Sequence, residues 1–181
     1  MITEVRQMNR LHIRDGRESD RDTIQAVTLS AYQQYAAVMP PPHWESYRRN
    51  ILDTLSDVQP AEQIVAEQDK AVVGAVLLYP AGTVLSGPDG ASVTLAWPEV
   101  RLLAVAPSAR GQGIGKALMQ ECLRRAHQSR SAAITLHTSD MMEVAMHMYE
   151  RMGFVRTPEF DFQPAPGVTI KGYRLSLDGT I

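Results

Sequence analysis

Two segments near the start of the chain carry apolar residues at helical spacing. Across 18–39, apolar side chains recur every three or four positions after a group of residues suited to helix capping. Three prolines at 40–42 end this pattern, and a second helical pattern begins at His43 and continues to Asp57. The spacing therefore predicts two consecutive helices. Their inward positions are Ile24, Val27, Ala31, Tyr35 and Val38 in the first helix, and Trp44, Tyr47, Ile51 and Leu55 in the second.

Apolar runs of strand length make up much of the remaining chain. They lie at 11–15, 63–68, 71–79, 99–107, 132–138, 154–157 and 168–177. The second and third runs are separated by Asp69 and Lys70 alone, which predicts a hairpin. Residues 82–97 are rich in glycine and turn-forming residues and predict a long irregular loop.

Two further helical patterns alternate with the later strands. The first covers 113–129 and places Cys122 on one face with Leu118 and Ala126, which predicts a small buried side chain rather than a nucleophile. The second covers 140–153, with Asp140 and Glu143 as a predicted capping box and a glycine at the C-terminal end. A strand, helix and strand in succession predict a parallel pair joined by a right-handed crossover.

The order of elements predicts one α/β domain (α+β mixed) over 1–181, with its core at about 11–177. The hairpins imply antiparallel neighbours on either side of the parallel pair. A mixed sheet with helices on both faces follows.

Composition narrows the function classes. The 18 basic and 20 acidic residues give a net charge of -2, which does not indicate a surface for nucleic acid or for an anionic membrane. One cysteine among 181 residues excludes an internal disulfide, and five scattered histidines lack metal-ligand spacing, so no metal is expected. The first residues lack a signal-peptide core, and a cytoplasmic protein is the expectation.

The segment RGQGIGK, residues 110–116, stands between the strand at 99–107 and the following helix. Alternating glycines let a backbone approach a ligand closely, and free N–H groups at a helix N-terminus favour an anion such as phosphate. Arg110 and Lys116 add positive charge. The spacing matches neither the P-loop nor the Rossmann fingerprint.

Two motifs together resemble a known family. The segment 110–115 matches [QR]-x-x-G-x-[GA], the acyl-CoA signature of the GNAT superfamily of N-acyltransferases, and the strand before it ends in that family's L-x-V-x-P pattern. Residues 145–154, AMHMYERMGF, are similar to the family's late motif A-x-x-x-Y-E-[KR]-x-G-F. The resemblance implies the GNAT fold: a mostly antiparallel sheet of six to seven strands with a central parallel pair, and about four helices on both faces.

The resemblance also implies a binding site for acetyl-CoA as the acyl donor. In the family, the two parallel strands splay apart, and the pantetheine arm pairs with the exposed strand edge. Carried over, the backbone at Leu103, Ala104 and Val105 would meet that arm. The loop made of Arg110, Gly111, Gln112, Gly113, Ile114, Gly115 and Lys116 would surround the pyrophosphate.

The catalytic residues implied by the resemblance are Tyr149 and Glu99. Tyr149 matches the family's general acid, which protonates the departing CoA thiolate. Glu99 lies where family members often keep an acidic base, and His137 is a second candidate for that role. Met142 stands where the family commonly has an asparagine that contacts CoA, so that contact is in doubt.

The acceptor is an amine that the sequence does not name. The resemblance implies that the first two helices line its pocket, through Tyr32, His43 and Trp44, whereas Tyr35 suits helix packing. A homodimer is frequent in the family. The alternative to an N-acetyltransferase is a regulatory module that binds acyl-CoA without turnover.

Overall fold

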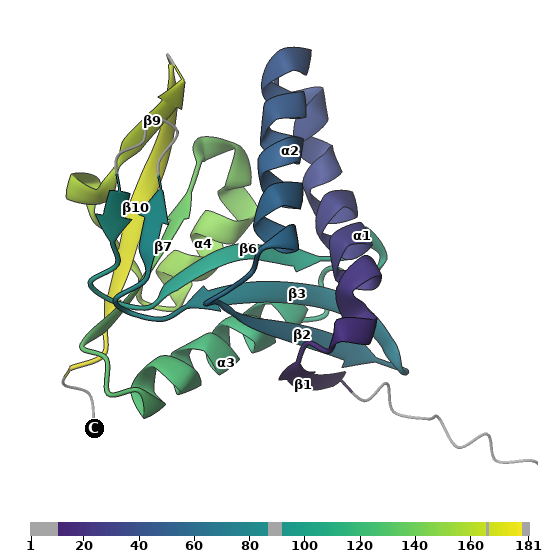
Figure 1. The fold of residues 1–181 in the computed structure, drawn as a ribbon, viewed down its shortest axis with the longest axis horizontal. Coiled ribbons are helices and arrows are strands. Elements are labelled where there is room, and N and C mark those ends of the chain that lie inside the picture. The colour runs from purple at the N-terminus through teal and green to yellow at the C-terminus, as the bar shows by residue number, and fades with distance from the viewer. Residues whose placement is uncertain (1–10, 87–91, 166, 179–181) are drawn as a thin grey trace, which may run out of the picture.

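The computed structural model describes residues 11–86, 92–165 and 167–178, which form one mixed sheet covered by helices on both faces (Figure 1). The strands are β1 (Leu11–Asp15), β2 (Glu62–Gln68), β3 (Ala71–Tyr79), β4 (Val84–Ser86), β5 (Ser92–Thr94), β6 (Glu99–Val105), β7 (Ala133–Thr138), β8 (Val155–Arg156), β9 (Phe162–Ala165) and β10 (Val168–Ser176). The helices are α1 (Arg21–Tyr32), α2 (Pro41–Ser56), α3 (Ile114–Gln128) and α4 (Glu143–Arg151).

The main sheet has eight strands in the order β1-β2-β3-β6-β7-β10-β8, with β9 paired to β10. Every pairing is antiparallel except the central one, β6 with β7. This arrangement confirms the predicted fold class and the crossover through α3. The sheet is one strand larger than expected because 162–165 form β9, which the sequence pattern did not indicate.

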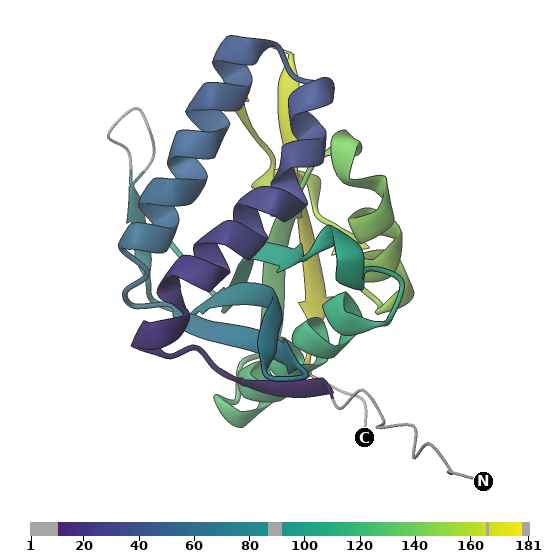
Figure 2. The ribbon, with the colours of Figure 1, turned by 90° about the vertical axis from the view of Figure 1, so that its right-hand side faces the viewer.

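Two hydrophobic layers hold the helices on the sheet. Helices α1 and α2 pack on one face over β2, β3 and β6, where Ile24, Ile51 and Leu77 are almost fully buried (Figure 2). Helices α3 and α4 cover the opposite face, where Leu118 and Ile134 are fully buried. The sheet is thus the middle of three layers, and side chains can project from it toward either pair of helices.

The first two helices differ from the prediction at their facing ends. Helix α1 stops at Tyr32 and continues as a 3-10 turn, η2 (Gln33–Ala37), whose tighter winding turns Val38 outward to 65% exposure. Helix α2 begins at Pro41 instead of His43, because proline suits the first helical position, where an N–H would lack a partner anyway.

Two local predictions on the later chain are wrong. The segment 82–97 is not wholly irregular, because β4 and β5 pair as a separate two-stranded sheet on either side of the undescribed residues 87–91. The capping box at Asp140 and Glu143 is absent: residues Asp140–Met142 form a 3-10 turn, η4, and α4 starts after Met142 without a side-chain cap.

Within the described residues, no helix is long and apolar enough to cross a membrane. The expectation of no signal peptide concerns residues 1–15, of which the first ten lie outside the described part of the chain.

Candidate active site

The parallel strands β6 and β7 separate soon after they meet. They pair only at Glu99 with Thr135 and at Val100 with Leu136. Beyond this point the edge of β6 that faces β7, residues 101–105, has no strand partner among the described residues. Unpaired N–H and C=O groups on a strand edge can accept an extended ligand as an additional strand.

A bulge marks the middle of this free edge. On the β3 side, Ala75 pairs with Ala104 and Leu77 with Arg101, so two residues, Leu102 and Leu103, stand opposite Val76. Leu102 adopts a left-handed φ of 50°, an uncommon conformation for a residue with a side chain. The bulge redirects backbone groups of β6 toward the gap between the strands.

The glycine loop leads from β6 into α3 with two left-handed residues. Gly111 has a φ of 75° and Gly113 a φ of 78°, and a Cβ on either would meet nothing within 4 Å. Glycine is therefore needed here for its backbone conformation and not for space. Among the described residues, no backbone acceptor pairs with the N–H groups of 111–116, which suit an anion at the start of α3.

The side chains of the loop have other partners or face the solvent. The guanidinium of Arg110 donates to the carbonyl of Ala31 at 2.9 Å and to Oε1 of Gln34 at 3.2 Å, so it caps the end of α1. Gln112 accepts from Gln68 at 3.0 Å, Ile114 is buried in the core, and Lys116 is exposed. The loop therefore offers an anion chiefly its backbone.

Tyr149 reaches the site from the last two turns of α4. Its side chain is buried at 6% exposure, and its ring packs edge-to-face on Phe154 with 5.9 Å between centroids. Burial raises the pKa of the Tyr149 hydroxyl well above its usual value, and the nearby Tyr35 and Tyr47 raise this pKa further. The phenol thus stays protonated at neutral pH and can act as a proton donor.

Aromatic residues from α1, η2 and α2 pack together on the face of the sheet that these helices cover. Tyr32 contacts Tyr35 and Tyr47 edge-to-face, with ring centroids 5.8 and 5.9 Å away, and Trp44 contacts Tyr47 at 6.4 Å. The Tyr32 hydroxyl also lies 3.5 Å from the carbonyl oxygen of Leu103 in the bulge. The structure therefore brings Tyr32 and Trp44 together, whereas His43 is exposed on the first turn of α2.

Glu99 is a buried carboxylate with basic neighbours. Its side chain is only 4% exposed, Oε1 accepts from Nε of Arg101 at 2.6 Å, and Oε2 lies 3.4 Å from Nδ1 of His137. Burial opposes the charged form, but the neighbouring imidazole of His137 and the positive charge of Arg101 outweigh it and lower the pKa of Glu99. Glu99 is therefore ionised at neutral pH.

His137 is oriented by a carbonyl group. Its Nε2 lies 3.0 Å from the carbonyl oxygen of Phe160, which can only accept, so Nε2 carries a proton. Its buried Nδ1 makes no hydrogen bond of good geometry, and 3.4 Å to Glu99 is long for one. His137 and Glu99 thus form one loosely coupled pair, and the two residues predicted as alternative bases lie side by side.

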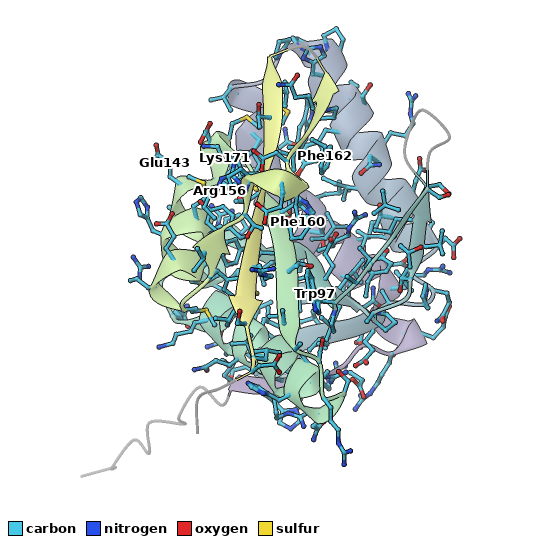
Figure 3. All side chains as sticks on the ribbon, turned by 90° about the vertical axis from the view of Figure 1, so that its left-hand side faces the viewer. Trp97, Glu143, Arg156, Phe160, Phe162 and Lys171 are labelled. Carbon is cyan, nitrogen blue, oxygen red and sulfur yellow. The ribbon has the colours of Figure 1, made fainter. Side chains whose placement is uncertain are left out.

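The segment 158–165 covers the far side of this pair, and the sequence reading missed it. Phe160 packs on Trp97 with 6.1 Å between ring centroids, and Phe162 packs on His137 with 5.4 Å. Figure 3 shows these aromatic residues along one side of β10, with Lys171 on the other side. A Cβ on Gly172 would come within 2.6 Å of Phe160, so only glycine lets this segment lie on the strand.

Comparison of the sequence with models of protein families is consistent with the fold and with the free strand edge. The sequence profile described as the Acetyltransferase (GNAT) family matches residues 28–154. The chain belongs to the GNAT acetyltransferase family.

Named relatives of this GNAT chain match it over about half its length. Mycothiol acetyltransferase of Cellulomonas flavigena is 32% identical over 100 residues, which cover 54% of this chain and 28% of the relative. N-acetyltransferase 8B of Mus musculus is 32% identical over 116 residues, which cover 64% of this chain and 47% of the relative. The chain therefore spans less than half the length of these two relatives.

Solved GNAT structures share the fold across almost the whole chain. A GNAT acetyltransferase of Staphylococcus aureus superposes with a TM-score of 0.69 at 16% identity, covering 93% of this chain and all of that one. A GNAT acetyltransferase of Brucella melitensis in complex with acetyl-CoA gives a TM-score of 0.59 at 24% identity, covering 96% and 92%. At this identity the likeness shows the fold.

Two further residues complete the comparison with the GNAT pattern. Met142 packs against the hydrophobic cluster under α1 and α2, so the position where the family commonly has an asparagine is apolar here.

Cys122 is fully buried between α3 and the sheet, and burial raises the pKa of its thiol to about 12. The thiol is thus protonated and inert, as the sequence predicted. No group of three metal-ligating side chains occurs among the described residues.

Proposed function

We propose that this protein is an N-acetyltransferase that moves an acetyl group from acetyl-CoA to a primary amine by direct transfer in a ternary complex. The observation that carries the proposal is the gap between β6 and β7, which leaves a free strand edge. The buried phenol of Tyr149 lies close enough to Tyr32 to affect its pKa, and the Tyr32 hydroxyl lies 3.5 Å from the carbonyl oxygen of Leu103 on β6. Family membership and relatives named as acetyltransferases support the same reaction.

The backbone groups of the site suit acetyl-CoA. The free edge at Leu103, Ala104 and Val105 would pair with the amide groups of the pantetheine arm, as a strand does. The N–H groups of 111–116 would hold the pyrophosphate at the positive end of α3. Solved neighbours with acetyl-CoA or coenzyme A bound support this choice of donor.

Acetyl-CoA supplies a thioester carbonyl for attack and a thiolate as leaving group. A primary ammonium, with a pKa of about 10.4, must first lose a proton before its nitrogen can attack. The ionised Glu99 can attract the ammonium and accept that proton, directly or through water. We assign the N–H groups of the bulge to stabilising negative charge on the carbonyl oxygen. Tyr149 then donates its phenolic proton to the sulfur as the C–S bond breaks, and the nitrogen of the intermediate returns its second proton to the tyrosinate. The proton held at Glu99 is released to solvent, which balances the transfer.

The proposed setting is the cytoplasm. A single buried thiol suits a reducing compartment, and a net charge of -2 gives no reason to invoke nucleic acid as a partner.

Tyr149→Phe tests the proposal directly. We expect the rate of CoA thiol release to fall by about 10²-fold or more, while acetyl-CoA affinity measured by calorimetry stays within a few-fold. Tyr173→Phe is the matched control, because the Tyr173 hydroxyl bonds Glu150 at 3.2 Å and this contact lies outside the gap. Equal turnover in the wild type and in Tyr149→Phe would contradict the role of Tyr149.

The same assay separates the enzyme from its alternative. Tight acetyl-CoA binding without thiol release, across peptides, amino acids, polyamines and aminoglycosides, would indicate a binding module. Weak binding would contradict both.

A further inference from the structure

Arg101 is held rigidly beside Glu99 but uses only part of its donor capacity. Its Nε donates to Glu99 at 2.6 Å, and its guanidinium lies over the ring of Tyr79, 5.6 Å from the centroid. Within the described part of the chain, its two terminal nitrogens donate to no protein group, and the side chain is 36% exposed. The planar end of the guanidinium therefore faces solvent in a fixed orientation.

Strand register aligns Glu99 with residues of three neighbouring strands. Tyr79 pairs with Glu99, Glu99 with Thr135, and Thr135 with Arg174, so these four residues form one row on the face covered by α1 and α2. Arg101 lies two residues after Glu99 on β6 and projects from the same face.

Other charged groups lie on or near this face. Arg174 lies over Trp97, with 5.3 Å from its guanidinium carbon to the ring centroid. Asp161 is engaged by Arg156 and by the N–H of Gly172, whereas Asp57 lies close enough to Tyr79 to contribute to the raised pKa of its hydroxyl. Two arginines, Arg101 and Arg174, thus lie on the same face of the sheet as Glu99.

We propose that Arg101 binds a carboxylate of the acceptor, and that the acceptor is therefore an amino acid or a compound with its amine and carboxylate close together. The proposal rests on the proposed acetyl transfer. The two terminal nitrogens of an arginine match the two oxygens of a carboxylate, and such paired hydrogen bonds are strong and directional.

The arrangement also fixes the distance between the two charged ends of the acceptor. Glu99 attracts the ammonium, and Arg101 is in direct contact with Glu99. An acceptor that uses both residues must carry its opposite charges within a few bonds of each other, as an α-amino acid does. A polyamine or an aminoglycoside has no carboxylate and would place a cation against Arg101.

The competing explanation is that Arg101 only neutralises Glu99. That role needs a positive charge but no free guanidinium edge. Arg101→Lys keeps the charge and removes the paired geometry, whereas Arg101→Gln removes both. Arg174→Gln is the matched control, because Arg174 lies on the same face but is engaged by Trp97.

The experiment compares free L-amino acids with their α-amides as acceptors. In Arg101→Gln and Arg101→Lys we expect kcat/KM for the best free amino acid to fall about 10- to 100-fold more than kcat/KM for its amide, because any effect of Arg101 on Glu99 is common to both acceptors. The intrinsic reactivity of the two amines cancels, because each acceptor is compared between wild type and variant. Arg174→Gln should retain the preference for the acid, and calorimetry with acetyl-CoA checks that every variant is folded.

Three outcomes would overturn the inference. An equal loss with the acid and the amide in Arg101→Gln would show that Arg101 acts only through Glu99. Turnover of amides or polyamines without turnover of free amino acids would refute carboxylate binding and leave the acetyl transfer intact. Absence of thiol release with every amine, despite tight acetyl-CoA binding, would instead refute the proposed function and this inference with it.

Discussion

The glycine loop and the face around Glu99 are built in opposite ways. The loop is seven consecutive residues, 110–116, whose working groups are backbone N–H donors shaped by two left-handed glycines. The face around Glu99 gathers side chains from β3, β6, β7 and β10, which are far apart in the chain. A backbone site can be carried by a short motif, whereas a side-chain site depends on strand register.

This difference explains how the two regions tolerate change. The proposed role of the loop, which is to bind the acyl donor, depends on backbone conformation at single positions. The face around Glu99 consists of charged and aromatic side chains, and each of them can be replaced singly without altering the fold. We expect the residues around Glu99 to determine which acceptor the protein binds.

Glu99→Gln should give the largest effect on stability. It leaves Arg101 and His137 without a buried negative partner, so we expect the free energy of unfolding at pH 7 to fall by about 2 kcal/mol. Because the pKa of Glu99 is lowered in the folded state, its contribution is fully present above its unfolded pKa and is lost as pH falls through the folded value. Urea unfolding between pH 7 and pH 3 should show the two proteins converging at low pH. A constant difference would contradict this linkage.

Gly113→Ala tests the loop. A Cβ at a φ of 78° costs about 1–2 kcal/mol, so we expect acetyl-CoA affinity or folding stability to drop by that amount. Gly115→Ala is the control, because its Cβ would lie 3.7 Å from both Met148 and Val105, an ordinary contact. Calorimetry and thermal unfolding measure both variants. Equal effects at the two positions would show that crowding, not conformation, governs the loop.

Arg110→Gln should have the smallest effect on stability. It removes the contact between the glycine loop and the end of α1. Its guanidinium bonds to α1 would be lost, and we expect the free energy of unfolding to fall by about 1 kcal/mol. Acetyl-CoA affinity should change less than threefold, because the proposed phosphate contacts come from backbone N–H groups. A tenfold loss of affinity would indicate that the Arg110 side chain itself turns to the phosphate.

The sequence was most informative where the pattern is local. Periodicity located the four helices and the hairpin of β2 and β3, and the two glycine-containing motifs identified the family. The capping box failed because η4 inserts a 3-10 turn ahead of α4. Strand β9 was missed because it is short and contains a proline, although the alternation of Phe160 and Phe162 was a usable signal.

The side-chain site could be predicted only in part. Tyr149 and Glu99 could be proposed from the sequence because they occupy motifs or motif positions of the family, and their roles stay predictions. Arg101 and Trp97 were not, because their importance depends on which residues pair across β3, β6 and β10. The bulge at Leu102 shifts that register by one residue, and a shift of one residue in a strand reverses which face a side chain occupies.

The short pairing between β6 and β7 has a thermodynamic consequence. The two parts of the sheet share only two residue pairs at its centre, so a donor molecule lying along β6 would complete the hydrogen bonding that the polypeptide leaves unfinished. Such a ligand would contribute to the structure of the sheet as well as to the reaction. At a concentration 100 times its Kd it would add about 2.7 kcal/mol to folding stability. The concentration of acetyl-CoA would then affect the fraction of this protein that is folded as well as its rate of turnover.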